Sequence, residues 1–284
     1  MKYQIDHDLH IHTYISGCAG HDPRQSKEAI LTYGLVNGFG LLCVCDHIWD
    51  RKVTPAYLNE HSWSWLTHGQ DFEKARELLP LPQSKSCKFL FGIEADMDWQ
   101  GNIAISREEW DNFDFINFAV NHLHLTNFTY NPSDASKYSS SEEGFKALYK
   151  ERLLRLLNMD LPFHKCGLAH FTLGPLKAFT LFSDEEYREI FGLAAEKGMG
   201  VELNFSEELE YSVSSPQDEE ILLHPYRIAK EMGCKFYLGG DAHDPEYLAS
   251  RKAWFERMVD LLELTEDDKF DFVKKHLAKP ALDI

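Results

Sequence analysis

Positive charge is scarce in this sequence. Its 29 lysines and arginines stand against 46 aspartates and glutamates, and the formal net charge is -17. The basic residues form no run that would attract the phosphates of nucleic acid or of anionic lipid. The charge balance therefore disfavours a nucleic-acid or membrane partner, although an acidic surface also serves solubility.

Long apolar runs are missing as well. No segment of about 18 apolar residues is present that could cross a membrane, and the opening MKYQIDHDLH lacks the apolar core of a signal peptide. The six cysteines include no C-x-x-C pair, and three of them lie inside apolar, strand-like runs. Free, buried cysteines are typical of a reducing compartment, so we expect a cytoplasmic protein.

The 284 residues, 44% of them hydrophobic, suffice for one large α/β domain. No glycine-rich phosphate loop follows the first apolar run, which disfavours a dinucleotide-binding fold. Short apolar runs alternate with amphipathic stretches, and this order indicates parallel strands joined by helices. The predicted strands are 4–12, 40–46, 87–96, 113–122, 166–171, 199–205 and 234–243, and the predicted helices are 26–37, 70–79, 142–158, 184–197, 219–232 and 252–263.

Seven strands, several of them apolar on both faces, favour a barrel over an open sheet. We expect one domain over residues 1–284, with an insert at 48–69 and a helical C-terminal segment from residue 250. The insert carries Trp49, Trp63 and Trp65, which are expected to form a small core of their own, with a substrate platform as the alternative. The insert and a polar loop at 123–141 both follow strand ends, where barrels of this kind place their active sites.

The predicted strand ends share a polar composition. Residues two apart on a strand point to the same side, so Asp8, His10 and His12 are expected to form one row. Nearly every other predicted strand also ends in histidine or a carboxylate, and a barrel brings these ends to one face: Asp46 and His47, Glu94 and Asp96, His122 and His124, His170, Glu202 and Asn204, Asp241 and His243. Imidazole and carboxylate together are ligands of zinc, iron or manganese, and their number here exceeds the needs of one ion.

These motifs resemble those of a known family. The ordered series DLHIHT, CDH, GIEADMD, NHLH, GLAHF, VELNF and GGDAHD, spread over residues 5 to 245, is similar to the series of the PHP (polymerase and histidinol phosphatase) family. GIEADMD and GGDAHDPEY most resemble the histidinol-phosphatase branch. The resemblance implies a distorted (β/α)7 TIM-like barrel that holds two or three divalent ions (zinc, manganese or iron) and hydrolyses phosphate esters.

The resemblance also implies a ligand set. A first ion would be held by the two histidines of the opening motif and by two carboxylates: His10, His12, Glu94 and Asp241. Glu94 would bridge to a second ion held by His122 and His170. A third ion would use His47 and His243. His122 is preferred to His124, which lies deeper in its loop.

The chain departs from the family at the third ion. Trinuclear members have a histidine where this chain has Cys18, six residues after the second histidine of H-x-H. His21 in the following loop, or less favourably Cys18, is expected to complete the site, with a weak or empty third site as the alternative. Asp8 and Glu202 are candidates to orient ligand histidines, with plain hydrogen bonding as the alternative.

The predicted function is metal-dependent hydrolysis of a small phosphate monoester. Glu94 and Asp241 would hold ions that activate water, and either His243 or a bound water would protonate the leaving alkoxide. Arg24 is a candidate to bind the substrate phosphate, although a solvated loop arginine is the plainer interpretation.

Other functions stay open. A nuclease of the same family is disfavoured by the acidic segment SEELEYSVSSPQDEEI after the sixth strand, which would repel a long polyanion. An amidohydrolase-type barrel has eight strands and usually a bridging lysine or glutamate on the fourth, whereas the glutamate here lies on the third of seven. A non-catalytic metal-binding module is disfavoured by the nearly complete ligand set.

Overall fold

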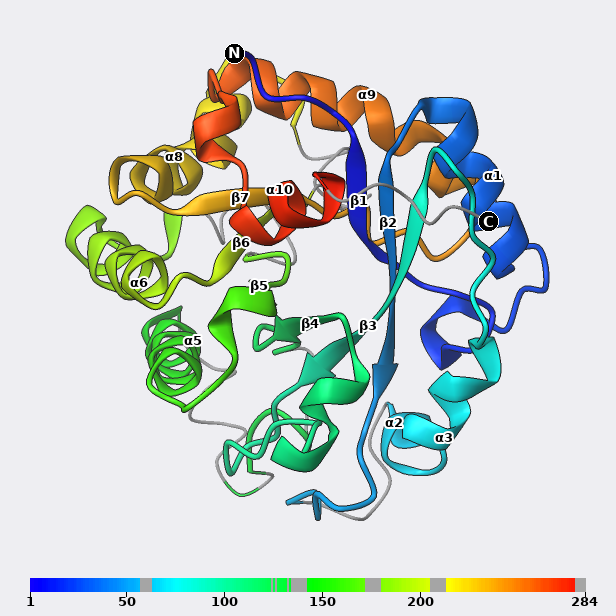
Figure 1. The fold of residues 1–284 in the computed structure, drawn as a ribbon. Coiled ribbons are helices and arrows are strands. Elements are labelled where there is room, and N and C mark those ends of the chain that lie inside the picture. Colours follow the sequence, from blue (N-terminus) through cyan, green and yellow to red (C-terminus); the bar gives the residue numbers. More distant parts are fainter. Residues whose placement is uncertain are drawn as a thin grey trace.

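Seven parallel strands form the centre of the molecule (Figure 1). The computed structural model describes residues 1–56, 63–123, 125, 127–131, 133, 142–171, 180–204 and 213–278. The strands pair in chain order and curl into a nearly closed barrel: β1 (His7–Ile11), β2 (Leu41–Ile48), β3 (Lys88–Asp96), β4 (Phe115–Ala119), β5 (Cys166–Leu168), β6 (Gly200–Leu203) and β7 (Lys235–Leu238). This arrangement confirms the expected α/β domain with a TIM-like barrel.

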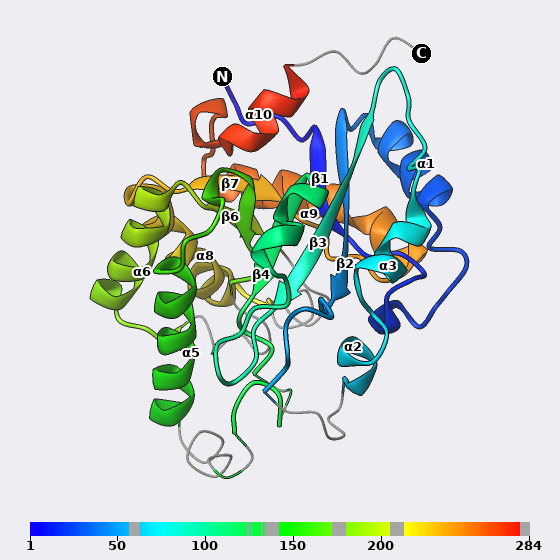
Figure 2. The same ribbon diagram turned by 60° about the horizontal axis from the view of Figure 1, so that its bottom comes forward.

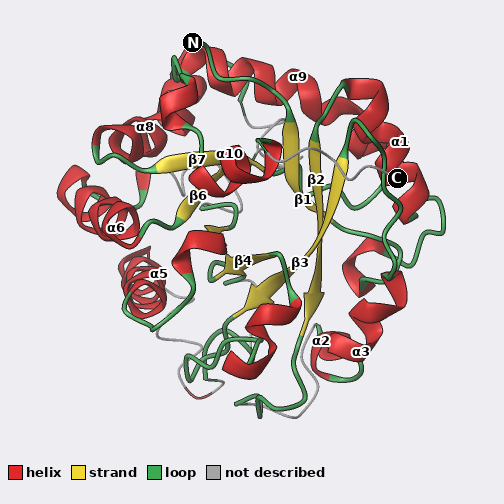
Figure 3. Cartoon of the chain, viewed as in Figure 1, coloured by secondary structure: helices red, strands yellow, loops and turns green. Residues whose placement is uncertain are grey.

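Helices surround the barrel on its outside (Figure 3). The α-helices of the described residues are α1 (Lys27–Asn37), α2 (Ser64–Thr67), α3 (Phe72–Ala75), α5 (Glu142–Leu157), α6 (Asp184–Lys197), α8 (Pro216–Glu231), α9 (Pro245–Leu261) and α10 (Asp271–Leu277). Short 3-10 helices are η1 (Gly17–Ala19), η2 (Arg76–Leu78), η3 (Arg107–Asn112), η5 (Phe163–Lys165) and η7 (Glu266–Asp268). Within the described ranges, no helix has both the length and the apolar character to span a bilayer.

The predicted helices are present, with two differences. The segment predicted at 70–79 is divided into α3 and η2. Helix α9 begins well before residue 252, because the side chain of Asp244 caps it by accepting a hydrogen bond from the backbone amide of Tyr247 (2.8 Å). This cap comes directly after the polar segment that follows β7.

The barrel closes at the seam between β1 and β7 without a continuous ladder. An isolated bridge joins Ile11 to Ala242, just beyond the end of β7. The backbone amide of Asp241 donates to the carbonyl of His10 (2.6 Å), and the amide of His12 donates to the carbonyl of Ala242 (3.1 Å). These bonds hold the ends of the first and last strands together, so residues far apart in the sequence share one rim.

Apolar side chains fill the amino-terminal half of the barrel. Leu9, Leu41 and Phe115 belong to one buried cluster with Phe270 and Phe272, which come from the segment around α10. Figure 2 shows α10 at one end of the molecule and α2 at the opposite end. Because α10 closes the amino-terminal end, the polar strand ends are left at the other opening, where barrels of this kind bind their ligands.

Replacing Phe272 by alanine is expected to destabilise the fold by about 3–5 kcal/mol, the usual cost of removing a buried phenylalanine ring. The side chain is 5% exposed, and its ring lies 5.3 Å from that of Phe115. Urea unfolding of metal-free protein measures the change. Val36→Ala, at a side chain that is 80% exposed, should shift stability by no more than about 0.5 kcal/mol. If Phe272→Ala lowered the free energy of unfolding by less than about 1 kcal/mol, α10 would not be needed to close the amino-terminal end of the barrel.

Candidate metal centre

A β-bulge in β1 sets the direction of its side chains. The three steps from Asp8 to Ile11 match only two steps along β2. The extra residue breaks the strict alternation, so Leu9 and His10 both face the inside of the barrel. Asp8 instead accepts a hydrogen bond from the hydroxyl of Tyr33 in α1 (3.2 Å). The expected row of three side chains was therefore wrong at Asp8, while its two histidines do lie together.

Ligand-type side chains from the strand ends meet in one buried cluster. Their donor atoms form three overlapping groups, each within 4.8 Å: His10, His12, Glu94 and Asp241; His47, Glu94 and His122; and His12, Cys18 and His47. Glu94 is common to two of them. Its Oε2 atom lies 3.2 Å from His10, 3.3 Å from His12 and 3.1 Å from His47. Its Oε1 atom lies 2.6 Å from His170. The two oxygens thus face two sides of the cluster.

Carboxylates behind the cluster orient its imidazole rings. Asp96 lies 2.8 Å from Nδ1 of His47 and 2.6 Å from Nδ1 of His122. Glu202 lies 2.7 Å from Nδ1 of His10. Because a carboxylate only accepts, each Nδ1 atom carries the hydrogen, and in the neutral ring each Nε2 atom presents a lone pair to the cluster.

Two further histidines are held in the same way. Nδ1 of His170 donates to Oδ1 of Asn121 (3.0 Å), and Nδ1 of His243 donates to the backbone carbonyl of Asp241 (2.8 Å). Asp241 has a positive φ of 51°, which is uncommon outside glycine and is often found at functional sites. Converging Nε2 lone pairs and carboxylate oxygens fit divalent transition-metal ions.

Some of the orienting residues were not predicted in that role. Asp96 was noted at a strand end, and its position two residues after Glu94 on one strand was a usable signal, since both then share a face. Asn121 has no pattern that marks it. Glu202 was expected either to orient a histidine or to make a plain hydrogen bond, and its contact with His10 fits the first role.

Opposite charges dominate the electrostatics of the cluster. Burial alone would raise the pKa of Glu94, but the neighbouring histidines, His47 foremost, hold it well below its usual value. Burial alone would lower the pKa of His10, but Glu202, Asp241 and Glu94 raise it well above its usual value. The carboxylates are therefore anionic at neutral pH, and a metal ion has to displace protons from the imidazoles.

Cys18 lies inside the cluster, whereas His21 lies outside it. The Sγ atom of Cys18 is 3.7 Å from Nδ1 of His12. Burial would raise the pKa of this thiol, but His12 and His243 hold it well below its usual value. His21 is exposed, and its Nδ1 atom donates to the carbonyl of Tyr14 (3.0 Å). The geometry thus reverses the expected preference for His21 over Cys18.

Arg24 lies on the surface of the molecule. Its side chain is 62% exposed and pairs with Asp22 at 2.7 Å and with Glu246 at 2.8 Å. These contacts favour the interpretation of a solvated loop arginine over that of a phosphate ligand.

Two tryptophans of the insert pack on the cluster. The ring of Trp63 lies 4.9 Å from the rings of both His47 and His122, and the ring of Trp65 lies 6.0 Å from that of His47. Trp49 is part of the hydrophobic core. The expectation that the insert forms a core of its own does not hold for Trp63 and Trp65, which wall the cluster on one side.

Parts of the predicted loops lie outside the described residues. They are 57–62 of the insert, most of 123–141 including His124, and 205–212, which holds the first half of the acidic segment after β6.

Comparison by sequence finds no matching protein-family model and no matching curated protein. Comparison by structure finds a Listeria monocytogenes protein provisionally assigned as histidinol phosphatase hisK, with a TM-score of 0.57, 14% identity, and coverage of 88% of this chain and 100% of that one. It also finds a histidinol phosphate phosphatase from Lactococcus lactis, complexed with zinc, L-histidinol and phosphate, with a TM-score of 0.53, 16% identity, and coverage of 94% and 98%. At these identities the likeness concerns the fold, which agrees with the fold implied by the PHP motifs.

Replacing Asp96 by asparagine is expected to weaken metal binding by about 10–100-fold, the usual effect of losing a partner that orients ligand histidines. The amide replaces one of the two carboxylate oxygens by an NH2 group, which cannot accept the Nδ1 hydrogen of His47 or His122. Calorimetric zinc titration measures the affinity. The control is Asp98→Asn, because Asp98 accepts from backbone amides such as those of Gln100 and Asn102 (both 2.9 Å). Equal affinities of both variants and wild type would contradict the role given to Asp96.

Proposed function

We propose that this chain is a metal-dependent phosphoesterase that hydrolyses a small phosphate monoester. The observation that carries the proposal is the convergence of histidine Nε2 atoms on both oxygens of one buried carboxylate, Glu94. A structural zinc site is usually closed by four ligands. This cluster offers more donors than one such site uses, so it suits more than one ion together with a substrate.

The fold neighbours support the substrate class. The Lactococcus protein is a histidinol phosphate phosphatase whose structure contains zinc, L-histidinol and phosphate, and its fold matches 94% of this chain. Small phosphorylated metabolites are therefore the proposed substrates, and histidinol phosphate is the first to test. The acidic composition agrees with this choice, because it disfavours long polyanions.

Two ion positions are proposed around Glu94. The first has four donors close together: His10, His12, Glu94 and Asp241. The second faces Oε1 of Glu94, which lies 2.6 Å from His170 and 4.0 Å from His122. When bound, divalent ions lower the pKa of water and offset the negative charge that develops on a phosphoryl group.

The protein itself holds the ligand side chains in position and excludes water from one side of the cluster. Asp96 and Glu202 hold imidazole rings in place before any ion binds, so little reorganisation is needed during the reaction. Trp63 and Trp65 cover one side of the cluster. Burial of the cluster strengthens its electrostatic contacts to a phosphoryl group.

The direct test is a phosphatase screen on metal-restored protein. The panel contains histidinol phosphate, sugar phosphates and nucleotides, and phosphate release is measured before and after chelation. Release from at least one monoester, lost on chelation and regained with metal, is the expected result. Protein that retains several bound ions and yet releases phosphate from none of them would contradict the proposal.

Glu94→Gln is expected to remove metal and activity together. A neutral amide with one acceptor oxygen cannot bridge two cations, so elemental analysis should show loss at both positions and turnover should nearly vanish. The matched control is Glu231→Gln, at a surface glutamate that pairs with Arg188 (2.8 Å), and it should keep both properties. Wild-type metal content and activity in Glu94→Gln would show that this residue is not the bridge.

Substrate size gives a second prediction. The first turn of α8 carries Asp218 and Glu219, and this helix follows β6 from the carboxyl end of the barrel. Acidic side chains near the carboxyl end of the barrel and the net charge of -17 repel each phosphate of a nucleic-acid strand. The kcat/KM on a small monoester should therefore exceed that on a single-stranded oligonucleotide by at least about tenfold, or roughly 1.4 kcal/mol. Steady-state kinetics at one salt and metal concentration measures the ratio, and equal efficiency would favour a nuclease instead.

A further inference from the structure

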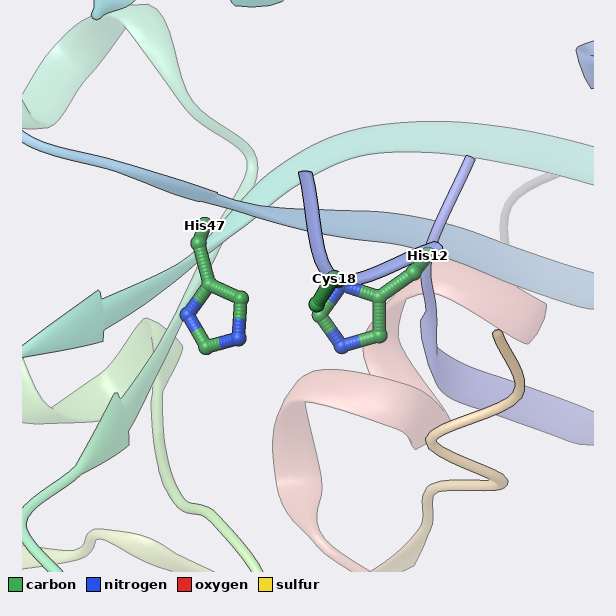
Figure 4. Close-up of side chains that lie close together, drawn as sticks. All are labelled: His12, Cys18 and His47. Carbon is green, nitrogen blue, oxygen red and sulfur yellow. Dashed lines mark hydrogen bonds between the residues drawn. The ribbon is translucent and has the colours of Figure 1, made fainter. Parts of the chain in front are cut away.

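The sulfur of Cys18 is enclosed by histidines. Figure 4 shows Cys18 beside His12, with His47 facing the pair. The Sγ atom lies 3.7 Å from Nδ1 of His12, and the ligand atoms of all three residues lie within 4.8 Å of one another. His243, whose ring stacks on that of His12 at 4.2 Å, also interacts with this sulfur. Three imidazoles thus surround one thiol.

Packing of the loop holds the sulfur in this place. Cys18 lies in η1, and the preceding Gly17 lies directly against Trp65, where a Cβ atom would come within 2.5 Å of the indole. Trp65 packs in turn near His47, at a ring distance of 6.0 Å. The hydroxyl of Ser16 lies 2.9 Å from the sulfur on another side. The tertiary structure therefore directs this thiol into the cluster.

Two of the surrounding histidines donate through Nδ1 to fixed acceptors. Nδ1 of His47 donates to Asp96, and Nδ1 of His243 donates to the carbonyl of Asp241. In the neutral rings, both Nε2 atoms are then acceptors. A cation bound by the sulfur and by Nε2 of His47 satisfies both groups together, and any proton that the sulfur or the imidazole carries leaves to solvent as the metal binds.

We propose that Cys18 is itself a metal ligand and that, with His47, it forms a sulfur-containing position that favours zinc over manganese or magnesium. This inference rests on the proposed metal centre and adds a chemical distinction within it. Thiolate is a soft ligand that selects zinc, whereas manganese and magnesium prefer oxygen. Bond lengths of about 2.3 Å for Zn–S and 2.0–2.1 Å for Zn–N place sulfur and nitrogen roughly 3.5 Å apart in a tetrahedral site. Separations of up to 4.8 Å in the group of Cys18 and His47 need only a small contraction.

Cobalt substitution tests the sulfur ligand without relying on activity. The metal-free protein is loaded with Co²⁺, and its cobalt content and near-ultraviolet absorption are measured. Thiolate bound to cobalt gives a charge-transfer band there that nitrogen and oxygen ligands do not give. The band is expected in wild type and in Cys87→Ser, which changes a buried cysteine outside the three ligand groups. It should be lost in Cys18→Ser, together with the preference for zinc over manganese in a competition experiment.

The outcomes separate this inference from the proposed function. Wild-type protein that binds cobalt without the band would overturn the sulfur ligand, leave the metal centre intact, and leave Cys18 as a hydrogen-bond partner of His12. A band that persists in Cys18→Ser would also overturn it. Protein that binds no cobalt, zinc or manganese would overturn both the metal centre and the sulfur ligand.

Discussion

The buried carboxylate of Glu94 organises the polar end of the barrel, because imidazoles from several strands converge on it. Imidazole nitrogens lie 2.6 Å from one of its oxygens and 3.1 Å from the other. Burial of an ion costs several kcal/mol unless opposite charge and hydrogen bonds offset it. In the protein without metal, protonated histidines supply that positive charge, and in the proposed holoenzyme divalent ions replace the protons. The cluster therefore contributes little to stability by itself and is best understood as a site kept ready for cations.

Several departures from regular structure bring donors to this carboxylate. The bulge in β1 turns His10 inward directly after Leu9. The left-handed backbone of Asp241 lies at the seam where β7 meets β1, and its amide bonds to the carbonyl of His10. Asp96 uses both oxygens to orient two rings at once. The bulge and the left-handed residue each cost some strand pairing or backbone freedom. The buried apolar cluster at the amino-terminal end of the barrel contributes stability that offsets these costs.

Much of this architecture could be predicted from sequence, because each strand is a short apolar run that ends in a ligand-type residue. Parallel topology then brings those ends to one rim, which is why His47, Glu94 and His170 were predicted to lie together. Side-chain direction was less predictable. A bulge adds one residue without a local signature, so Asp8 was placed in the wrong row. That Cys18 lies in the cluster and His21 outside it depends on how the loop packs, and distance along the sequence does not encode that packing.

Metal ions are proposed to occupy the space around Glu94, and anomalous diffraction from crystals of the zinc-loaded protein tests this. Anomalous peaks are expected on both sides of the carboxylate. One peak lies among His10, His12 and Asp241, and another lies toward His122 and His170. Zinc-loaded crystals that show no peak within bonding distance of Glu94, with the histidines still paired to the carboxylates as ion pairs, would contradict the account.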